Sequence, residues 1–169
     1  TDGTNGQVLS TNGASVLSWT AAGDWTLIAS SSCSGTCNAI SAEASSTRKF
    51  LKITLLYNAI SGASAQAFQI NDDTGGNYTW RSDTNGTVTS GTAQTLCRFM
   101  TASNAGSGYL EISGSNQIND NKMLVHRGSG DNGSANIPTQ VDGACAWFNT
   151  TSNLLKFTAF NETGSVTFG

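Results

Sequence analysis

The sequence predicts an all-β protein: an antiparallel β-sandwich of the jelly-roll kind, preceded by a short β-hairpin. Charged residues make up only 11% of the 169 residues, against a usual share of about 25%. Gly, Ser, Thr and Asn take their place, and these residues disfavour long helices. Short apolar runs recur along the chain, several with every second residue apolar, and turn-forming clusters separate them. This spacing is typical of an antiparallel sandwich.

The first predicted element is a β-hairpin. Two runs, Gln7–Thr11 and Ala14–Trp19, flank Asn12-Gly13. Asn-Gly is the strongest signal for a two-residue type I′ turn. We assign residues 1–22 to this hairpin and residues 23–169 to the sandwich, because the chain is long enough for one sizeable core and leaves little room for two.

The expected register makes both faces of the hairpin apolar. Leu9 faces Val16 on one side, while Val8, Leu17 and Trp19 lie on the other. An isolated hairpin is barely stable in water, so both faces need a cover. We expect the following domain to cover one face and copies from sister chains to cover the other. These five residues are therefore the predicted oligomer contacts.

Ten further strands are expected after the hairpin, each an apolar run between turn clusters. The alternation is clearest where Leu51, Ile53 and Leu55 share one face and Lys52 and Thr54 share the other. The expected strands are Trp25–Ala29, Arg48–Tyr57, Ala65–Ile70, Tyr78–Arg81, Gln94–Thr101, Tyr109–Ile112, Lys122–Arg127, Gly143–Phe148, Leu154–Phe160 and Ser165–Phe168.

Four cysteines suit two disulfides in an extracellular protein. We expect Cys33 and Cys37 to close a small ring, and Cys97 and Cys145 to link two strands. A zinc site fits poorly, because Cys97 and Cys145 are isolated and the sole histidine, His126, is far from all four cysteines in sequence. Buried free thiols remain an alternative.

Part of the chain resembles a known repeat. The residues Gly3-Thr4-Asn5-Gly6-Gln7-Val8-Leu9-Ser10-Thr11-Asn12-Gly13, followed by Leu17-Ser18-Trp19, resemble the repeat "G-T-x-G-Q-V-L-T-S-N-G-x…W" of bacteriophage tail fibres and related viral fibre proteins. The resemblance covers about twenty residues. It implies a trimeric β-structured shaft just before a carboxyl-terminal head. It also implies that the chain, which opens at Thr1, is a piece of a longer virion protein.

A looser resemblance covers the rest of the chain. The order of features is similar to that of fibre-head domains: an opening strand at Trp25, a long strand at Phe50–Tyr57, a loop at Asp72–Tyr78 and a closing Gly164–Gly169. Together the two resemblances imply a homotrimer on the virion surface. Its expected partners are other virion proteins and a host receptor or surface glycan.

Charge and motifs argue against several other classes of function. The formal net charge is -3, and the eight Lys and Arg residues are scattered singly, so nucleic acid binding is not expected. No run approaches 18 apolar residues, so no membrane insertion is expected. The chain is not expected to be an enzyme. Nothing brings two of its carboxylates onto one strand face, and His126 is more easily placed at a strand end near solvent than in a catalytic triad.

The loop around residue 72 is the predicted ligand site. Asp72 and Asp73 precede a strand that carries Tyr78, Trp80 and Arg81. Aromatic faces beside planar polar groups suit recognition of a sugar. The alternative is that Trp80 belongs to the core. No cofactor is predicted, although oxygen-rich loops of this kind also suit calcium, and Asp, Asn and Gly are equally what a tight turn requires.

The sequence therefore predicts a virion fibre or spike tip that mediates attachment to the host surface. Two alternatives stay open. One is a purely structural capsid decoration or trimerisation cap. The other is a carbohydrate-binding module of a secreted bacterial protein, which would keep the sandwich as a monomer.

Overall fold

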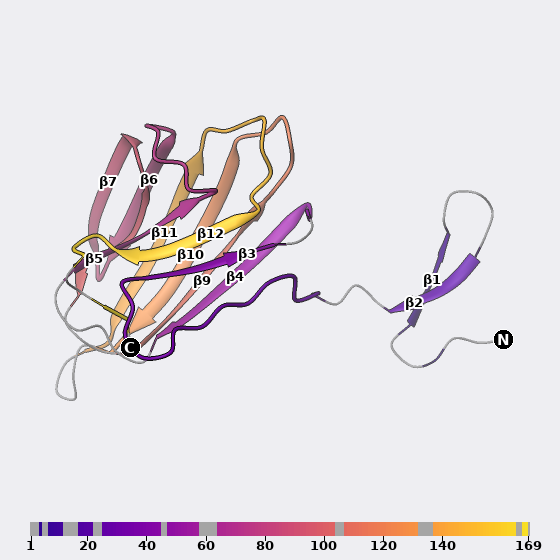
Figure 1. Ribbon diagram of the computed structural model, residues 1–169, viewed down its shortest axis with the longest axis horizontal. Helices are drawn as coiled ribbons and strands as arrows, with labels where there is room; N and C mark the ends of the chain where they lie inside the picture. Colours follow the sequence, from indigo (N-terminus) through magenta and orange to yellow (C-terminus); the bar gives the residue numbers. More distant parts are fainter. Residues whose placement is uncertain are drawn as a thin grey trace.

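The structure is a computed structural model, and it confirms the all-β class. It describes residues 4, 7–11, 17–21, 25–44, 47–57, 64–103, 107–131, 137–164 and 167–168. Within these residues it contains twelve strands and no helix. Two antiparallel sheets face each other as a sandwich, and a two-stranded hairpin lies apart from them (Figure 1).

The larger sheet of the sandwich has six strands in the order β4-β9-β10-β11-β6-β7. They are β4 (Phe50–Tyr57), β9 (Gly108–Ser115), β10 (Lys122–Gly130), β11 (Thr139–Trp147), β6 (Tyr78–Thr84) and β7 (Thr87–Gln94). The smaller sheet has four strands in the order β3-β12-β5-β8. They are β3 (Ala39–Glu43), β12 (Lys156–Asn161), β5 (Ser64–Ile70) and β8 (Cys97–Ser103).

The strand pairs are nested as in a jelly roll. β6 pairs with β7 across the two-residue turn Asn85-Gly86, whose φ angles of 51° and 83° suit a type I′ turn. Around this hairpin lie the pairs β5–β8, β4–β9 and β3–β12 in turn. Successive pairs alternate between the two sheets, and β10 and β11 add one extra hairpin to the larger sheet.

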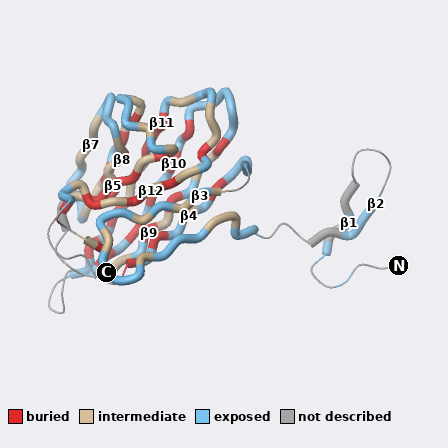
Figure 2. The backbone as a smooth tube through the Cα atoms, viewed as in Figure 1, coloured by how far each residue is buried: buried red, intermediate tan, exposed pale blue. Residues whose placement is uncertain are grey.

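The core lies between the two sheets, where Figure 2 shows the buried stretches of the strands. β10 is a clear case, because every second residue from Lys122 to Gly130 is buried. The disulfide between Cys97 and Cys145 crosses this core and ties β8 to β11, while Cys33 and Cys37 close a small ring. Both expected disulfide pairings are confirmed.

The hairpin is present, but its predicted register is wrong. β1 (Gln7–Thr11) pairs with β2 (Leu17–Ala21) so that Leu9 lies opposite Trp19 and Thr11 lies opposite Leu17. The connection is therefore five residues long, and its residues 12–16, with the expected Asn12-Gly13 turn, lie outside the described residues. This register gathers Leu9, Leu17 and Trp19 on one face.

The register change also alters the case for an oligomer. One apolar face of the hairpin, carrying Leu9, Leu17 and Trp19, now needs a cover, where two were expected. Val8 of β1 lies opposite Thr20 of β2. The fifth predicted contact residue, Val16, lies outside the described residues.

Four strand assignments also differ from the predictions. The run Trp25–Ala29 forms no strand. At the carboxyl end only Phe168 takes part in a bridge, with Cys37, and residues 165 and 166 lie outside the described residues. β3 and β7 were missed, because both are edge strands with only one large apolar residue each, Ile40 in β3 and Val88 in β7. An edge strand with one exposed face carries little of the apolar signal used to find it.

His126 was expected at a strand end near solvent, and this was wrong. It lies in the middle of β10 and is fully buried. Its neighbour across the ladder is Gly143, and a Cβ at that position would lie 2.3 Å from Nε2 of the histidine. The glycine therefore makes room for the imidazole ring. Burial lowers the pKa of His126 to about 4, although Asp142 acts in the opposite direction.

Candidate functional site

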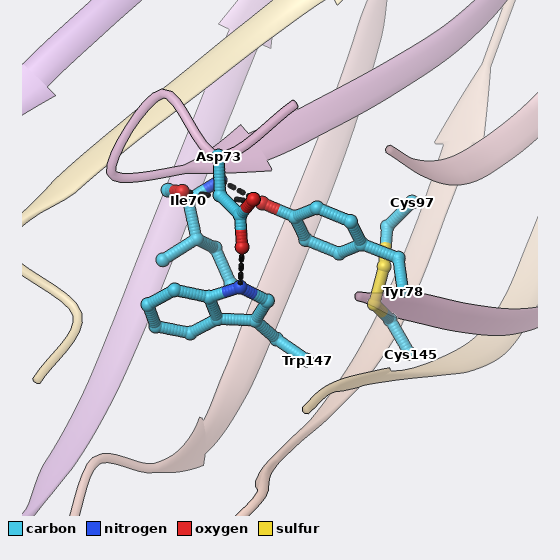
Figure 3. Close-up of a disulfide and its surroundings, with 6 residues drawn as sticks. All are labelled: Ile70, Asp73, Tyr78, Cys97, Cys145 and Trp147. Carbon is cyan, nitrogen blue, oxygen red and sulfur yellow. Dashed lines mark hydrogen bonds between the residues drawn. A yellow bond between two sulfur atoms is a disulfide. The ribbon is translucent and has the colours of Figure 1, made fainter. Parts of the chain in front are cut away.

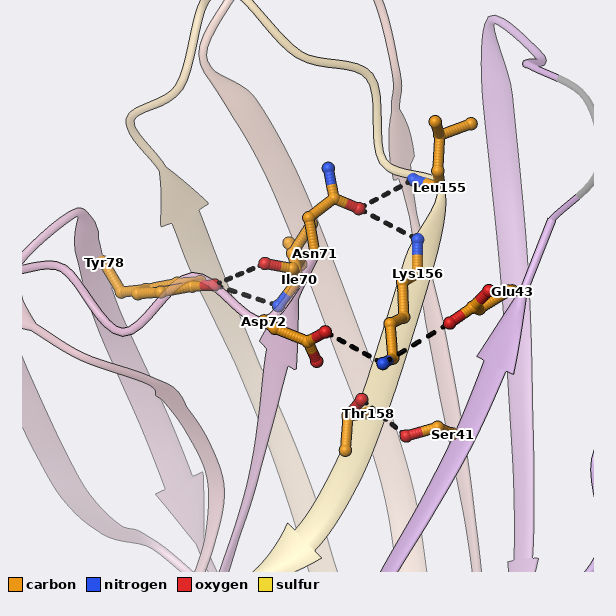
Figure 4. A network of polar contacts seen from close by, with 9 residues as sticks. All are labelled: Ser41, Glu43, Ile70, Asn71, Asp72, Tyr78, Leu155, Lys156 and Thr158. Carbon is orange, nitrogen blue, oxygen red and sulfur yellow. Dashed lines mark hydrogen bonds and ion pairs between the residues drawn. The ribbon is translucent and has the colours of Figure 1, made fainter.

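The predicted ligand loop carries the chain from the smaller sheet to the larger one. It begins with Asn71 and Asp72, both in the left-handed backbone region with φ of 52° and 54°. Asn and Asp tolerate this region better than most residues, which explains their place at the turn. The side chain of Asn71 then accepts hydrogen bonds from the backbone N–H groups of Leu155 and Lys156, both at 2.9 Å (Figure 4). The loop is thereby fixed to the start of β12.

The carboxylate of Asp73 points into the protein and is fully engaged there. It accepts hydrogen bonds from the Trp147 indole nitrogen at 2.7 Å (Figure 3). It also accepts from the Asn77 side-chain amide at 2.9 Å and from the Gly75 backbone N–H at 2.8 Å. Burial raises the pKa of Asp73, but these three hydrogen bonds outweigh it and lower the pKa below its usual value. Asp73 therefore holds the loop in shape.

Tyr78 and Trp80 were predicted to face a ligand, and the structure corrects this. Both are buried, at 0% and 5% exposure. The Tyr78 hydroxyl donates to the Ile70 carbonyl and accepts from the Ile70 N–H (Figure 3). The Arg98 guanidinium lies 5.3 Å from the centre of the Trp80 ring and covers it. The alternation along β6 had placed these two aromatic residues on one face, and that face is the core.

Asp72 points the other way, along the outer face of the smaller sheet. It accepts a hydrogen bond from Lys156 Nζ at 2.8 Å, and Glu43 lies 3.4 Å from the same nitrogen (Figure 4). The hydrogen bond to Asp72 is the main cause that raises the pKa of Lys156. Asp72 and Asp73 are thus held by different partners, and their carboxylates do not converge on one point.

The other carboxylates show the same pattern of separate partners. Glu111 pairs with Lys52 at 2.8 Å and Glu162 pairs with Arg98, just as Glu43 pairs with Lys156. Among the described residues, no group of three or more His, Cys, Asp or Glu side chains could hold a metal ion.

Arg81 is the one predicted site residue that is exposed on the larger sheet. It lies opposite Ala144 in the register, and Ala144 lies opposite Val125. Val125 and its neighbour on the same face, Met123, are 60% and 54% exposed. On β4 the exposed residues Phe50 and Leu56 belong to the same outer face.

Two ion pairs lie among these apolar side chains. Lys52 bonds Glu111 at 2.8 Å, and Arg127 bonds Asp142 at 2.7 Å. The register sets Glu111 beside Arg127, so the charges alternate in sign across the sheet. We call this outer face of the larger sheet, made of Phe50, Lys52, Leu56, Arg81, Glu111, Met123, Val125, Arg127 and Asp142, the exposed sheet face.

The smaller sheet has a different outer surface. Ser41 and Thr158 share a hydrogen bond of 2.7 Å there, next to the pairs that Lys156 makes (Figure 4). Among the described side chains, none of the large exposed apolar residues belongs to a strand of this sheet. A sheet face in water is normally polar, so the exposed sheet face is the unusual one.

Sequence reasoning missed the exposed sheet face, although a signal was present. Met123 and Val125 were read simply as part of an apolar run. The residues that alternate with them along the strand are Leu124, His126 and Gly128. Both faces of the strand therefore carry large side chains. A strand with apolar residues on both faces predicts either burial on both sides or a contact surface.

Comparison with known proteins finds no matching family model, no matching curated protein and no matching solved structure. No helix in the described part of the chain has the length and apolar character that a membrane crossing requires.

Proposed function

We propose that this chain is the tip of a viral fibre or spike, with the hairpin as shaft and the sandwich as the head that contacts the host surface. The observation that carries the proposal is a contrast between the two parts. The sandwich encloses its own core within one chain. The hairpin leaves Leu9 and Leu17 53% and 64% exposed, and Trp19 lies beside them. A hairpin of this kind needs another surface to pack against, and further copies of the chain would supply one.

The exposed sheet face supports the second half of the proposal. It combines apolar side chains with Arg81 and with charges that are already paired within the chain. Such a surface offers apolar contacts and one guanidinium to a partner. A receptor or surface glycan is the proposed partner, and other virion proteins would contact the shaft.

The first experiment measures the mass of the protein in solution by light scattering. A trimer of the 17.5 kDa chain is expected. The double change Leu9→Ser and Trp19→Ser should convert it to a monomer, because it removes the apolar face of the hairpin. Ile137→Ser is the matched control, since Ile137 is an exposed apolar residue outside the strands. A wild-type monomer would remove the fibre proposal.

The second experiment measures binding to host cells and to a panel of immobilised glycans. Arg81→Ser and Val125→Ser should each weaken binding, whereas Lys49→Ser, an exposed cation outside the exposed sheet face, should not. An oligomer that binds neither cells nor glycans would favour the structural cap. In that outcome the exposed sheet face would have no receptor role.

The self-contained sandwich also favours a second candidate, a monomeric carbohydrate-binding module. Its core and its Cys97–Cys145 disulfide lie entirely within one chain. A monomer that binds glycans would support this candidate, and a trimer would count against it.

A further inference from the structure

An apolar cavity of about 460 Å³ opens at one side of the sandwich. It lies where β3 ends the smaller sheet and β4 ends the larger one. Side chains from both edges line it, with a larger contribution from β4 than from any other strand. They include Ile40, Leu51, Ile53, Leu55, Phe157 and Phe168.

The cavity exists because small side chains occupy one wall. β3 presents Ala42 to the cavity, and Ala44 follows just after the strand. On the opposite wall Ile53 is only partly buried, although its neighbours Leu51 and Leu55 belong to the core. The side chains of the two edge strands therefore leave a space between them, whereas those in the middle of the sandwich are in contact.

A segment without strand structure covers the opening. Residues 27–33 line the cavity, and in Figure 1 this stretch runs beside β3 and β4. Ile28 packs against the core, whereas Leu27 is 81% exposed. The end of the cover is held by the Cys33–Cys37 disulfide and by two backbone hydrogen bonds between Cys37 and Phe168, at 2.7 and 3.0 Å.

The lining is mainly aliphatic and aromatic. The one charged residue that borders the cavity is Lys52. Its ammonium pairs with Glu111 on the outer face of the sheet, away from the cavity. Ser30, Ser31 and Ser32, three consecutive residues of the cover, are also among the lining residues. No lining group could neutralise a charged ligand, so a buried charge would be costly there.

We propose that this cavity binds an uncharged, mainly aliphatic small molecule, with any hydroxyl directed to the serines of the cover. The volume falls within the range of about 300–1,000 Å³ for ligand sites. It is also about three times the size of an engineered apolar cavity, about 150 Å³, that binds benzene. The site is separate from the exposed sheet face and the hairpin, and the proposal does not depend on the fibre function.

The test uses the neutral fluorescent probe N-phenyl-1-naphthylamine with the disulfide-intact protein. Saturable binding is expected, with displacement by dodecanol and little displacement by dodecanoate. The absence of saturable binding would overturn the proposal. Equal displacement by the two competitors would overturn the preference for an uncharged ligand, because nothing in the lining stabilises a carboxylate.

Two variants on one strand locate the site. Ala42→Phe places a ring in the cavity and should weaken probe binding by about tenfold or more, because the ring takes the volume of the ligand. Ala39→Phe is the control on the exposed face of β3 and should bind as the wild type does. Unchanged binding in Ala42→Phe would overturn the proposal.

Folding and assembly are checked in the same variants. Ala42→Phe should keep the cooperative thermal transition of the wild type. If it unfolds instead, Ile53→Phe on the opposite wall replaces it, with the same expected loss of binding. A change of mass in solution for the cavity variant alone would show that a second copy of the chain occupies the cavity, and this too would overturn the proposal.

Discussion

The indole nitrogen of Trp147 lies 2.7 Å from a carboxylate oxygen of Asp73, so a residue on β11 fixes a loop 74 positions earlier in the chain. Tyr78, the first residue of β6, stacks on the same indole with ring centres 6.5 Å apart. The loop predicted to bind a ligand is therefore a structural clamp between the two sheets (Figure 3).

Replacement of Asp73 by Ala should destabilise the protein by about 1–3 kcal/mol, because the buried Trp147 N–H would be left without an acceptor. Asp72→Asn is the matched control. It removes the charge of a partly exposed ion pair with Lys156, keeps a residue type that tolerates the left-handed backbone there, and should cost much less. Urea unfolding measures both. Equal losses in the two variants would contradict the clamp.

Acid should weaken the fold through His126. Its pKa is lowered from 6.5 to about 4 in the folded protein, chiefly by burial. The unfolded chain therefore takes up the proton first, and stability that is complete above pH 6.5 falls as the pH drops toward 4. Through this group the free energy of unfolding changes by at most about 1.4 kcal/mol per pH unit. Urea midpoints at pH 7, 6 and 5 measure it.

His126→Leu should flatten this dependence between pH 6.5 and 5, since Leu does not titrate. Asp73 and Glu111, whose pKa values are lowered, affect stability only at lower pH. A variant that keeps the wild-type slope in that window would show that His126 is not its source.

The two disulfides should differ in their contribution to stability. Cys97–Cys145 closes a loop with a sequence separation of 48, and Cys33–Cys37 one with a separation of 4. From chain entropy alone the first contributes about 4 kcal/mol and the second about 2 kcal/mol. Two variants test this order, one with both Cys97 and Cys145 changed to Ala and one with both Cys33 and Cys37 changed to Ala. Urea unfolding measures the stability of each. A larger loss at Cys33–Cys37 would contradict it.

Much of the fold could be predicted from the sequence, because composition, alternation and cysteine spacing act locally. The pairings Cys33–Cys37 and Cys97–Cys145 are one such case, and both match the structure. The hairpin shows the limit. There the Asn12-Gly13 signal suggested one register, yet the observed register places three apolar side chains on one face.

The candidate site was harder to predict, for a physical reason. Alternation shows that Tyr78 and Trp80 share a face, but it does not show which face is the core. That choice depends on Trp147 and Arg98, which are distant in sequence. Likewise, no local signal shows that the ion pairs of Lys52 and Arg127 lie among exposed apolar residues.

Gly143→Ala should be strongly destabilising, by about 3 kcal/mol, at the upper end for overpacked sites. The new Cβ would lie 2.3 Å from His126 Nε2 and 2.4 Å from the Arg81 carbonyl oxygen, which belongs to the backbone and cannot turn away. Gly164→Ala is the control, because its nearest neighbour is Asn38 at 3.9 Å. Thermal unfolding compares them, and equal melting temperatures would contradict the prediction.

The nested pairing of strands has a consequence for how the chain reaches this fold. The outermost pair, β3–β12, joins segments far apart in sequence, whereas β6 and β7 are separated only by Asn85-Gly86. Closing long loops costs entropy before contacts repay it, so topologies of this kind have high contact order and fold slowly. We expect strand pairing to begin at β6–β7 and to proceed outward. Pulse-labelled hydrogen exchange should then show protection of the β6 and β7 amides before those of β3. The cover of the cavity, anchored at Cys37 and Phe168, would then close among the last steps.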